Sequence, residues 1–495
     1  MLLESPDTDV KGILMQDAHK TYRPWDANSN SSQSYSPDAV LAEDDLVFFL
    51  IDLVPKLDLS AFYAHYEQET CGAPPYDAAM MCTLLCYGYA VGVCSSRKIA
   101  AACERNLAFL AIVGTQPPNF RTISDFRKIH HQAFADLFVE VLRVAGELGM
   151  VRLGNLAIDG SKMKANASRH KAMSYDYMTK EVERLRGEVK ELLARADKVD
   201  GQEDAAWGSR RGDELPDELK RRLDRLQNIE TAMKRLEEEA QERAEAERQQ
   251  RAQREAEREA EGKKRRGRQP KPVDESPKER AQTNFTDADS KVMKTSNKGF
   301  DYCYNGQAVV DGEEQIIVAA EVTNECNDKQ QAAPMAKAAL ENLQAADILQ
   351  SPDDNSPARR YAVTTTKPAR AIPATLDSGY FSEEAVTGLE DMGIDPHIAT
   401  GRQKHHEPQS AEAQGSAPAG ATAKERMAHK LRTPAGKKCY AQRKAIVEPV
   451  FGQIKQGRGI RQFLLRGLDK VRGEWKLIAL THNLLKIWRR CCAPN

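Results

Sequence analysis

Three acidic residues stand where carboxylates could bind divalent cations: Asp159, Asp377 and Glu448. Asp159 and Asp377 each close a short apolar run and precede a glycine-containing turn, which is typical of the C-terminal end of a strand. Glu448 is the only acid between Glu425 and Asp469, and its apolar neighbours recur at helical spacing. Carboxylates at adjacent strand ends, with a third from a helix, can hold two hard cations that clamp a phosphodiester. This pattern predicts metal-dependent phosphoryl transfer.

The surroundings of Glu448 leave two interpretations open. A lone carboxylate at the apolar edge of a basic helix is costly unless a cation meets it. Lys455 follows seven residues later, so on a helix it lies two turns along the same face. A surface ion pair between Glu448 and a neighbouring lysine explains this helix as well as a metal does. The two upstream aspartates favour the metal site.

The order of these motifs resembles that of bacterial insertion-sequence DDE transposases. The likeness spans about residues 45–490 and rests on four segments: Asp159-Gly-Ser-Lys, Leu376-Asp-Ser-Gly-Tyr-Phe-Ser, Val447-Glu-Pro-Val-Phe-Gly-Gln-Ile-Lys and Tyr304-Asn-Gly-Gln. The resemblance implies that Asp159, Asp377 and Glu448 are the catalytic residues. It also implies that they bind Mg²⁺ (or Mn²⁺) as the cofactor.

The same family has a Tyr-x2-Arg-x3-Glu-x6-Lys signature. Four residues fit it, with one extra residue before the glutamate: Tyr440, Arg443, Glu448 and Lys455. Lys444 stands at the family's spacing in place of Arg443. We expect Lys455, and either Arg443 or Lys444, to hold DNA phosphates near the cations. Lys162 and Lys164 follow the first aspartate and are expected to track a DNA strand.

Two amides, Asn305 and Gln307, lie on the strand expected after the first aspartate. They could help to position the substrate. Buried strand amides that pair with the backbone explain them equally well, and the sequence does not choose between these roles.

The charge of the chain is strongly uneven. Lys and Arg number 72 and Asp and Glu 73, a formal net charge of −1. Between Lys424 and Arg490, however, 18 basic residues face only 4 acidic ones. Such a local excess favours a polyanionic partner, which we expect to be the DNA of element ends and target. A merely solvated basic face would usually carry more interspersed acids.

Ten cysteines are present, but the acidic N-terminal segment lacks the pattern of a secretory signal. We therefore expect reduced thiols and a cytoplasmic, nucleoid-associated protein. The cysteine spacing includes no CxxC pair, so zinc is not expected. No run of 18 apolar residues occurs, so no membrane span is expected.

The order of patterns predicts an α/β protein with an RNase H-like catalytic domain, an all-α N-terminal domain and an inserted helical hairpin or coiled coil. The strands are expected near 156–159, 300–311, 315–323, 372–377 and 394–399. The predicted domains are a disordered leader over 1–43, a helical DNA-binding domain over 44–150, the catalytic domain over 151–175 and 284–490, and the insertion over 176–283.

Within the N-terminal domain, a helix is expected to open near Phe120 with basic residues close to its start. Arg121, Arg127 and Lys128 suit phosphate contacts in the manner of a helix that docks on DNA. A helical bundle that only braces the catalytic domain is the alternative.

The insertion carries apolar residues at heptad-like spacing on either side of a break predicted over 201–216. Those before the break are Val182, Leu185, Val189 and Leu192, and those after it include Leu219, Leu226 and Met233. The hairpin could brace a dimer or clamp DNA. The basic stretch at 263–271 resembles a minor-groove hook, although a plain basic linker fits it as well. Residues 401–438 are expected to form a long loop.

Together these features favour a transposase that cleaves element ends and joins them to target DNA, acting as a homo-oligomer. A nuclease or a domesticated DNA-binding protein of the same fold, without strand transfer, is the alternative. A coiled-coil scaffold whose acidic residues are incidental is a third interpretation.

Overall fold

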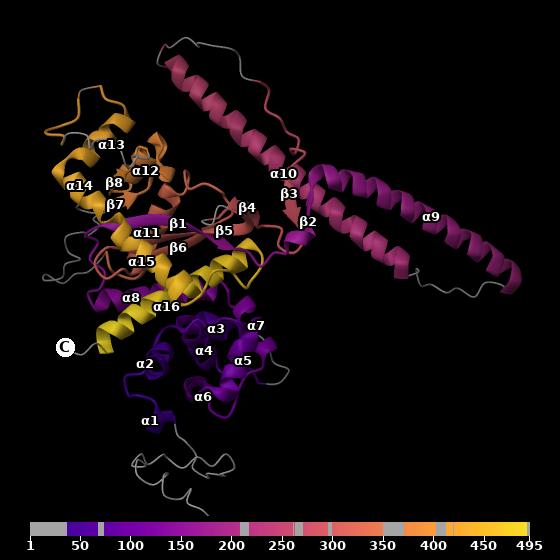
Figure 1. The fold of residues 1–495 in the computed structure, drawn as a ribbon, viewed down its shortest axis with the longest axis horizontal. Helices are drawn as coiled ribbons and strands as arrows, with labels where there is room; N and C mark the ends of the chain where they lie inside the picture. The colour runs from indigo at the N-terminus through magenta and orange to yellow at the C-terminus, as the bar shows by residue number, and fades with distance from the viewer. Residues whose placement is uncertain are drawn as a thin grey trace, which may run out of the picture. The chain divides into compact units, whose positions relative to one another are not determined.

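Apolar runs separated by turn residues form the strands of one mixed sheet, and helices with apolar faces pack against it (Figure 1). The computed structural model describes residues 37–67, 74–207, 217–260, 262, 271–295, 299–349, 371–401, 412–418 and 420–492. The chain divides into a unit of residues 1–43, which contains α1 (Pro37–Val40), and a unit of residues 44–495. Residues 1–36 of the predicted leader lie outside the described residues.

The described chain ahead of the sheet is helical, which confirms the prediction of a helical N-terminal region. Its helices are α2 (Leu46–Leu53), η1 (Val54–Lys56), α3 (Ser60–Glu67), α4 (Ala78–Ala90), α5 (Ser96–Arg105), α6 (Leu107–Val113), α7 (Phe120–Ile129) and α8 (Ala133–Glu147). Short polar side chains cap several of them: Asp77 accepts a hydrogen bond from the Met80 N–H, and Asn119 accepts from the first turn of α7. Helix α4 is buried almost all round because nearly every residue in it is apolar.

The sheet has the strand order β4-β5-β1-β7-β8, and β6 also pairs with β5. Its strands are β1 (Leu156–Lys164), β4 (Lys291–Lys294), β5 (Phe300–Asp311), β6 (Ile317–Thr323), β7 (Ile372–Leu376) and β8 (Ile394–Ile398). Strand β5 runs antiparallel to β1, β4 and β6, whereas β7 runs parallel to both β1 and β8. The predicted strands are therefore present, and β1 lies at the centre of the sheet.

Helices pack against the sheet and bring distant parts of the chain together. They are α11 (Ala332–Ala345), η4 (Ser378–Tyr380), α12 (Glu383–Asp391), α15 (Arg443–Gly452), the π-helical turn η5 (Gln453–Gly457) and α16 (Leu468–Cys492). Helix α11 contacts β5 and β6, and α15 contacts β1. Helix α16 contacts β6 and also contacts α4 and α8, so it lies between the sheet and the N-terminal helices (Figure 1).

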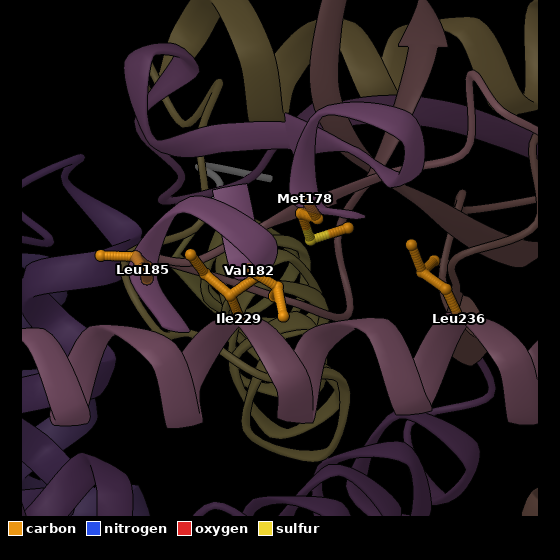
Figure 2. Packing of buried hydrophobic residues seen from close by; sticks show 5 residues of the cluster. All are labelled: Met178, Val182, Leu185, Ile229 and Leu236. Carbon is orange, nitrogen blue, oxygen red and sulfur yellow. The ribbon is translucent and has the colours of Figure 1, made fainter. Parts of the chain in front are cut away.

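Two long helices, α9 (Tyr175–Trp207) and α10 (Asp217–Ala260), interrupt the sheet after β1. They run antiparallel, because Glu181 pairs with Arg225 while Glu188, further along α9, pairs with the earlier Arg222. Figure 2 shows the apolar cluster between them, which consists of Met178, Val182, Leu185, Ile229 and Leu236. Burying each such side chain contributes about 1.5–3 kcal/mol. The 3-10 turn η2 (Arg169–Lys171) leads into a two-stranded sheet of β2 (Ala172–Ser174) and β3 (Gln282–Asn284) at the base of this pair.

The long loop predicted over 401–438 is not continuous. Helix α13 (Ala423–Arg432) lies within it, and α14 (Pro434–Ala441) begins there. A capping box starts α13, because Thr422 and Glu425 each accept a hydrogen bond from the other's backbone N–H. Pro434 occupies the first turn of α14, where its missing N–H removes no helical hydrogen bond.

The break predicted from residue 201 also begins later, because α9 continues to Trp207. A single glycine costs a helix only about 1 kcal/mol relative to alanine, which good helix-forming neighbours outweigh. Residues 208–216 and 263–270, which include most of the predicted basic linker, lie outside the described residues.

The nine cysteines in the described residues are all unpaired, as expected. In the same residues, no helix combines the length and the apolar character that crossing a membrane requires.

A buried polar cluster ties α16 to the N-terminal helices. The Glu474 side chain on α16 accepts a hydrogen bond from the Tyr89 hydroxyl of α4 at 2.8 Å. It also accepts from the backbone N–H groups of Leu464 and Leu465 at 2.9 and 2.8 Å. Arg127 of α7 donates in turn to the Tyr89 hydroxyl at 2.8 Å. Each of these polar groups is buried, so each needs the others.

We expect Glu474→Ala to lower the free energy of unfolding by about 3 kcal/mol, because several buried donors lose their acceptor together. Chemical denaturation followed by circular dichroism measures this loss. Glu390→Ala, which removes an exposed acid from α12, is the control and should leave the midpoint unchanged. Equal midpoints for both variants would contradict the structural role of Glu474.

Candidate active site

The two aspartates predicted at strand ends are neighbours in the structure. Strands β1 and β7 are parallel, and their last paired residues are Ile158 and Leu376. Asp159 and Asp377 directly follow these two residues. The two aspartates therefore lie side by side at the point where β1 and β7 stop pairing. The negative charge of Asp377 also raises the pKa of Asp159, which the proximity of the two carboxylates explains.

Asp159 is a poorly hydrated carboxylate with a cation already beside it. Its Oδ2 lies 2.9 Å from the Nη1 of Arg443, and its Oδ1 accepts from the Gly160 N–H at 2.8 Å. Burial raises the pKa of Asp159, while the Arg443 guanidinium and the Gly160 N–H oppose that rise. The net direction is upward, so the ionised form is held at a cost. A positive charge close to this carboxylate is therefore favourable.

Helix α15 and turn η5 run along β1 and touch it with a basic residue at each end. Arg443, the first residue of α15, reaches Asp159 as described above. Lys455 in η5 donates to the Ser161 hydroxyl, and to the Lys162 carbonyl at 2.9 Å. Burial lowers the pKa of Lys455. Of the two candidates for the arginine position of the signature, Arg443 meets the aspartate.

Lys444 and Glu448 are exposed on α15. Lys455 stands in the π-helical turn η5 and contacts β1, whereas Glu448 on α15 faces solvent. Within the described residues, however, no three His, Cys, Asp or Glu side chains are grouped closely enough to hold a metal ion. The structure therefore brings Asp159 and Asp377 together, while Glu448 stands on the neighbouring helix without joining them.

The pair of aspartates fits a divalent cation by its chemistry. Both residues supply carboxylate oxygens, which are the ligands that Mg²⁺ and Mn²⁺ prefer. The Arg443 guanidinium already occupies a cationic position at Asp159.

The lysines that follow the first aspartate each meet an acid. Lys162 lies 3.6 Å from an oxygen of Asp328, and its buried ammonium has no hydrogen bond among the described residues. Lys164 forms an ion pair of 2.9 Å with Asp301. Asp328 was not singled out from the sequence, where Asn327-Asp328 looks like an ordinary start of a helix.

The three basic residues proposed on α7 have different surroundings. Arg121 is exposed, and its guanidinium lies 5.9 Å from the centre of the Phe120 ring. Lys128 is exposed and pairs with Asp125 at 3.0 Å. Arg127 corrects the expectation of a DNA contact, because it is 4% exposed. Its guanidinium donates inward to Tyr89, to the Cys94 carbonyl and to Ser96.

Arg97 of α5 adds to this surface, since its guanidinium lies 5.4 Å from the same Phe120 ring. Two guanidinium groups thus flank one exposed aromatic ring beside a surface hollow. Arg97 was not among the residues predicted to contact DNA, because it stands on a different helix 23 residues upstream of the ring.

Comparison with known proteins identifies two segments. A family model described as Transposase DDE domain matches residues 407–488, which include Glu448. A second, described as Transposase domain (DUF772), matches residues 36–129, which include the helices from α1 to α7. Asp159 and Asp377 lie outside both segments. No curated protein and no solved structure matches the chain.

We expect Arg443→Ala to raise the pKa of Asp159 further. The guanidinium favours the ionised carboxylate, so its removal favours the protonated form and moves the titration midpoint to higher pH. Carboxyl ¹³C NMR of the metal-free protein with labelled aspartate measures this midpoint. Lys444→Ala removes an exposed neighbouring charge and serves as the control. An unchanged or lower midpoint in the Arg443 variant would be inconsistent with the ion pair.

Proposed function

This chain belongs to the DDE transposases of insertion sequences, and on that premise we propose that it cleaves DNA at element ends and joins those ends to target DNA by two-metal phosphoryl transfer. Enzymes of this class cut and join DNA with divalent metal ions. The observation that carries the proposal is the adjacency of Asp159 and Asp377, which directly follow the last paired residues of the parallel strands β1 and β7.

The order of the strands supports an RNase H-like catalytic domain. A central β1 is flanked on one side by the antiparallel pair β5 and β6, and on the other by the parallel strands β7 and β8. In the proposed division, residues 151–175 and 284–490 form this catalytic domain. Residues 44–150 form the DNA-binding domain, and 176–283 form the insertion.

Asp159, Asp377 and Glu448 are the residues that would hold the cations, with Mg²⁺ or Mn²⁺ as the proposed metal. Bound divalent cations lower the pKa of an attacking water or 3′-hydroxyl and stabilise the leaving oxygen. The protein needs no covalent intermediate with DNA for this chemistry, so none of its hydroxyl groups is assigned as a nucleophile.

The basic residues beside the aspartates are proposed to hold the phosphates. Arg443 neutralises Asp159 in the present structure, and its planar guanidinium suits a bidentate contact with a phosphate. Lys455 lies along β1 on the path that the DNA strand would follow away from the acids. Lys162 is left out of this path, because its ammonium is buried beside Asp328 on the other face of the sheet. Lys164 would contribute charge at the end of that strand.

On the N-terminal helices, the proposed DNA surface consists of Arg97, Phe120, Arg121 and Lys128. Both of its arginines are exposed, and each guanidinium lies over the Phe120 ring between them. Arg127 is left out of this surface because it is buried. Joining two element ends to one target requires several DNA segments at once, so a homo-oligomer is part of the proposal.

We expect Asp159→Ala, Asp377→Ala and Glu448→Ala each to lower cleavage of labelled element ends by more than about 100-fold. Losing a residue that only supports a metal ligand lowers activity by up to about 100-fold, so losing a ligand itself should cost more. Gel assays with purified protein and Mg²⁺ or Mn²⁺ measure cleavage and joining separately. Asp391→Ala, an exposed acid at the end of α12, is the control. Cleavage without joining by the native protein would favour a nuclease, and metal-independent or unaltered cleavage would exclude the proposed site.

We expect Arg121→Ala to weaken DNA binding and to reduce the slope of log affinity against log salt by about 1, because one phosphate contact is lost. Fluorescence anisotropy at several salt concentrations gives both values. Lys337→Ala on α11, an exposed lysine beside Glu341, provides a control with the same loss of charge. Equal slopes for both variants would remove Arg121 from the interface.

A further inference from the structure

The two buried amides of β5, Asn305 and Gln307, face the first catalytic strand. Gln307 stands opposite Gly160 and Asn305 opposite Lys162 in the antiparallel register, so these four residues share one face of the sheet. Asn305 and Gln307 are both 0% exposed. A side chain at residue 160 would collide with them, because an added Cβ would lie 2.9 Å from the Asn305 Oδ1. Gly160 therefore lets the amides pack directly against β1.

Asp328, in the turn that precedes α11, binds both of these amides. Its Oδ1 accepts a hydrogen bond from the Asn305 Nδ2 at 2.6 Å and from the Gln307 Nε2 at 2.7 Å. The Lys162 ammonium lies 3.6 Å from the same oxygen. An ionised carboxylate can only accept hydrogen bonds. Asp328 thus fixes both amides with their nitrogen atoms toward itself.

The fixed orientation of Gln307 determines what its other atom meets. With Nε2 on Asp328, the Oε1 of Gln307 must face the opposite way, where it accepts a hydrogen bond from the Tyr380 hydroxyl. Tyr380 is fully buried and lies three residues after Asp377, in the turn η4. Burial and the nearby charges of Asp328, Asp159 and Asp377 raise the pKa of Tyr380, so its hydroxyl stays protonated and donates.

The backbone of Gln307 reaches the third acidic element. Its carbonyl accepts from the indole Nε1 of Trp475 at 2.9 Å. The Trp475 ring stacks with Phe451 of α15, with ring centres 6.3 Å apart and planes 11° from parallel. Phe451 stands three residues after Glu448 on that helix. Gln307 therefore connects β7 through Tyr380 and α15 through Trp475 to the strand beside Asp159.

We propose that Asp328 is a positioning residue of the active site, which orients Gln307 so that Tyr380 holds the Asp377 turn against β1. This inference rests on the proposed function, because it assumes that Asp377 binds the catalytic cation. It also replaces the two roles that the sequence left open for Asn305 and Gln307, which were substrate contact and pairing with the backbone. Both side chains are buried, but they bind mainly the side chains of Asp328 and Tyr380, so the proposal assigns them to supporting the site.

A direct cation ligand is the competing role for Asp328. Its Oδ2 has no hydrogen bond among the described residues, and an added Cβ on Gly379 of the Asp377 turn would lie 3.9 Å from it. The face of the sheet argues against that role. Side chains alternate along β1, so Asp159 points to the face opposite the one on which Gly160 meets Asp328.

The two roles predict different results for two substitutions. Asp328→Asn keeps an oxygen that accepts from both amides, so a positioning role predicts that it retains most of the wild-type behaviour. Asp328→Ala removes that oxygen and frees Gln307 to rotate, and we expect it to raise the Mn²⁺ concentration for half-maximal cleavage by about 10-fold or more. Glu325→Ala, an exposed acid three residues upstream, is the matched control.

A second measurement does not depend on activity. Amide hydrogen exchange of the full-length protein without metal should become faster across residues 377–381 in Asp328→Ala and in Tyr380→Phe, but not in Asp328→Asn or Glu325→Ala. The double variant Asp328→Ala/Tyr380→Phe should exchange no faster there than the faster single variant, because both changes break one chain of contacts.

The outcomes separate the possibilities. The proposal is overturned if Asp328→Asn is as damaging to cleavage as Asp159→Asn, which would make Asp328 a cation ligand. It is also overturned if Asp328→Ala leaves exchange at 377–381 unchanged. If the wild-type protein itself cleaves no DNA, the proposed function fails, while the exchange experiment still decides whether Asp328 positions the turn.

Discussion

The burial of α16 on both sides is the constraint on which the rest of this structure depends. One side of the helix packs on β6 and the other on α4 and α8, so its polar groups must find partners inside the protein. Asn483 pairs with both backbone groups of Ile317 on β6, and Glu474 accepts from Tyr89 on α4. The same helix carries Trp475, which reaches the strand next to Asp159. The N-terminal helices and the acidic site are thereby held by one element.

The ion pair in the site has the same physical cause, because a charged group that is removed from water also needs a partner. Asp159 is largely removed from water where β1 stops pairing with β7, and it lies close to a second carboxylate; both effects raise its pKa. Arg443 offsets part of this cost. A carboxylate whose negative charge is disfavoured in this way gains from a nearby positive charge.

Much of the arrangement could be predicted from local patterns. The apolar runs that end at Asp159 and Asp377 predicted strand ends. This is right for Asp377, which follows the last residue of β7, and wrong for Asp159, because β1 continues to Lys164 by pairing with β5. The helix around Glu448 followed from apolar spacing. The position of Arg127 could not be predicted in this way, because a basic residue near a helix start looks the same whether it faces DNA or a buried tyrosine. For the same reason Asp328 was not predicted, because its two partners lie 21 and 23 residues away on β5.

By itself, the sequence determined the class of the protein, the elements and the acidic residues worth testing, because hydrophobic periodicity, turn residues and ordered motifs are properties of neighbours along the chain. Only the tertiary structure decided which acids meet, that Arg443 rather than Lys444 pairs with Asp159, and which polar groups point inward. Those outcomes depend on strand register and helix packing, which bring together residues hundreds of positions apart and which no local pattern specifies.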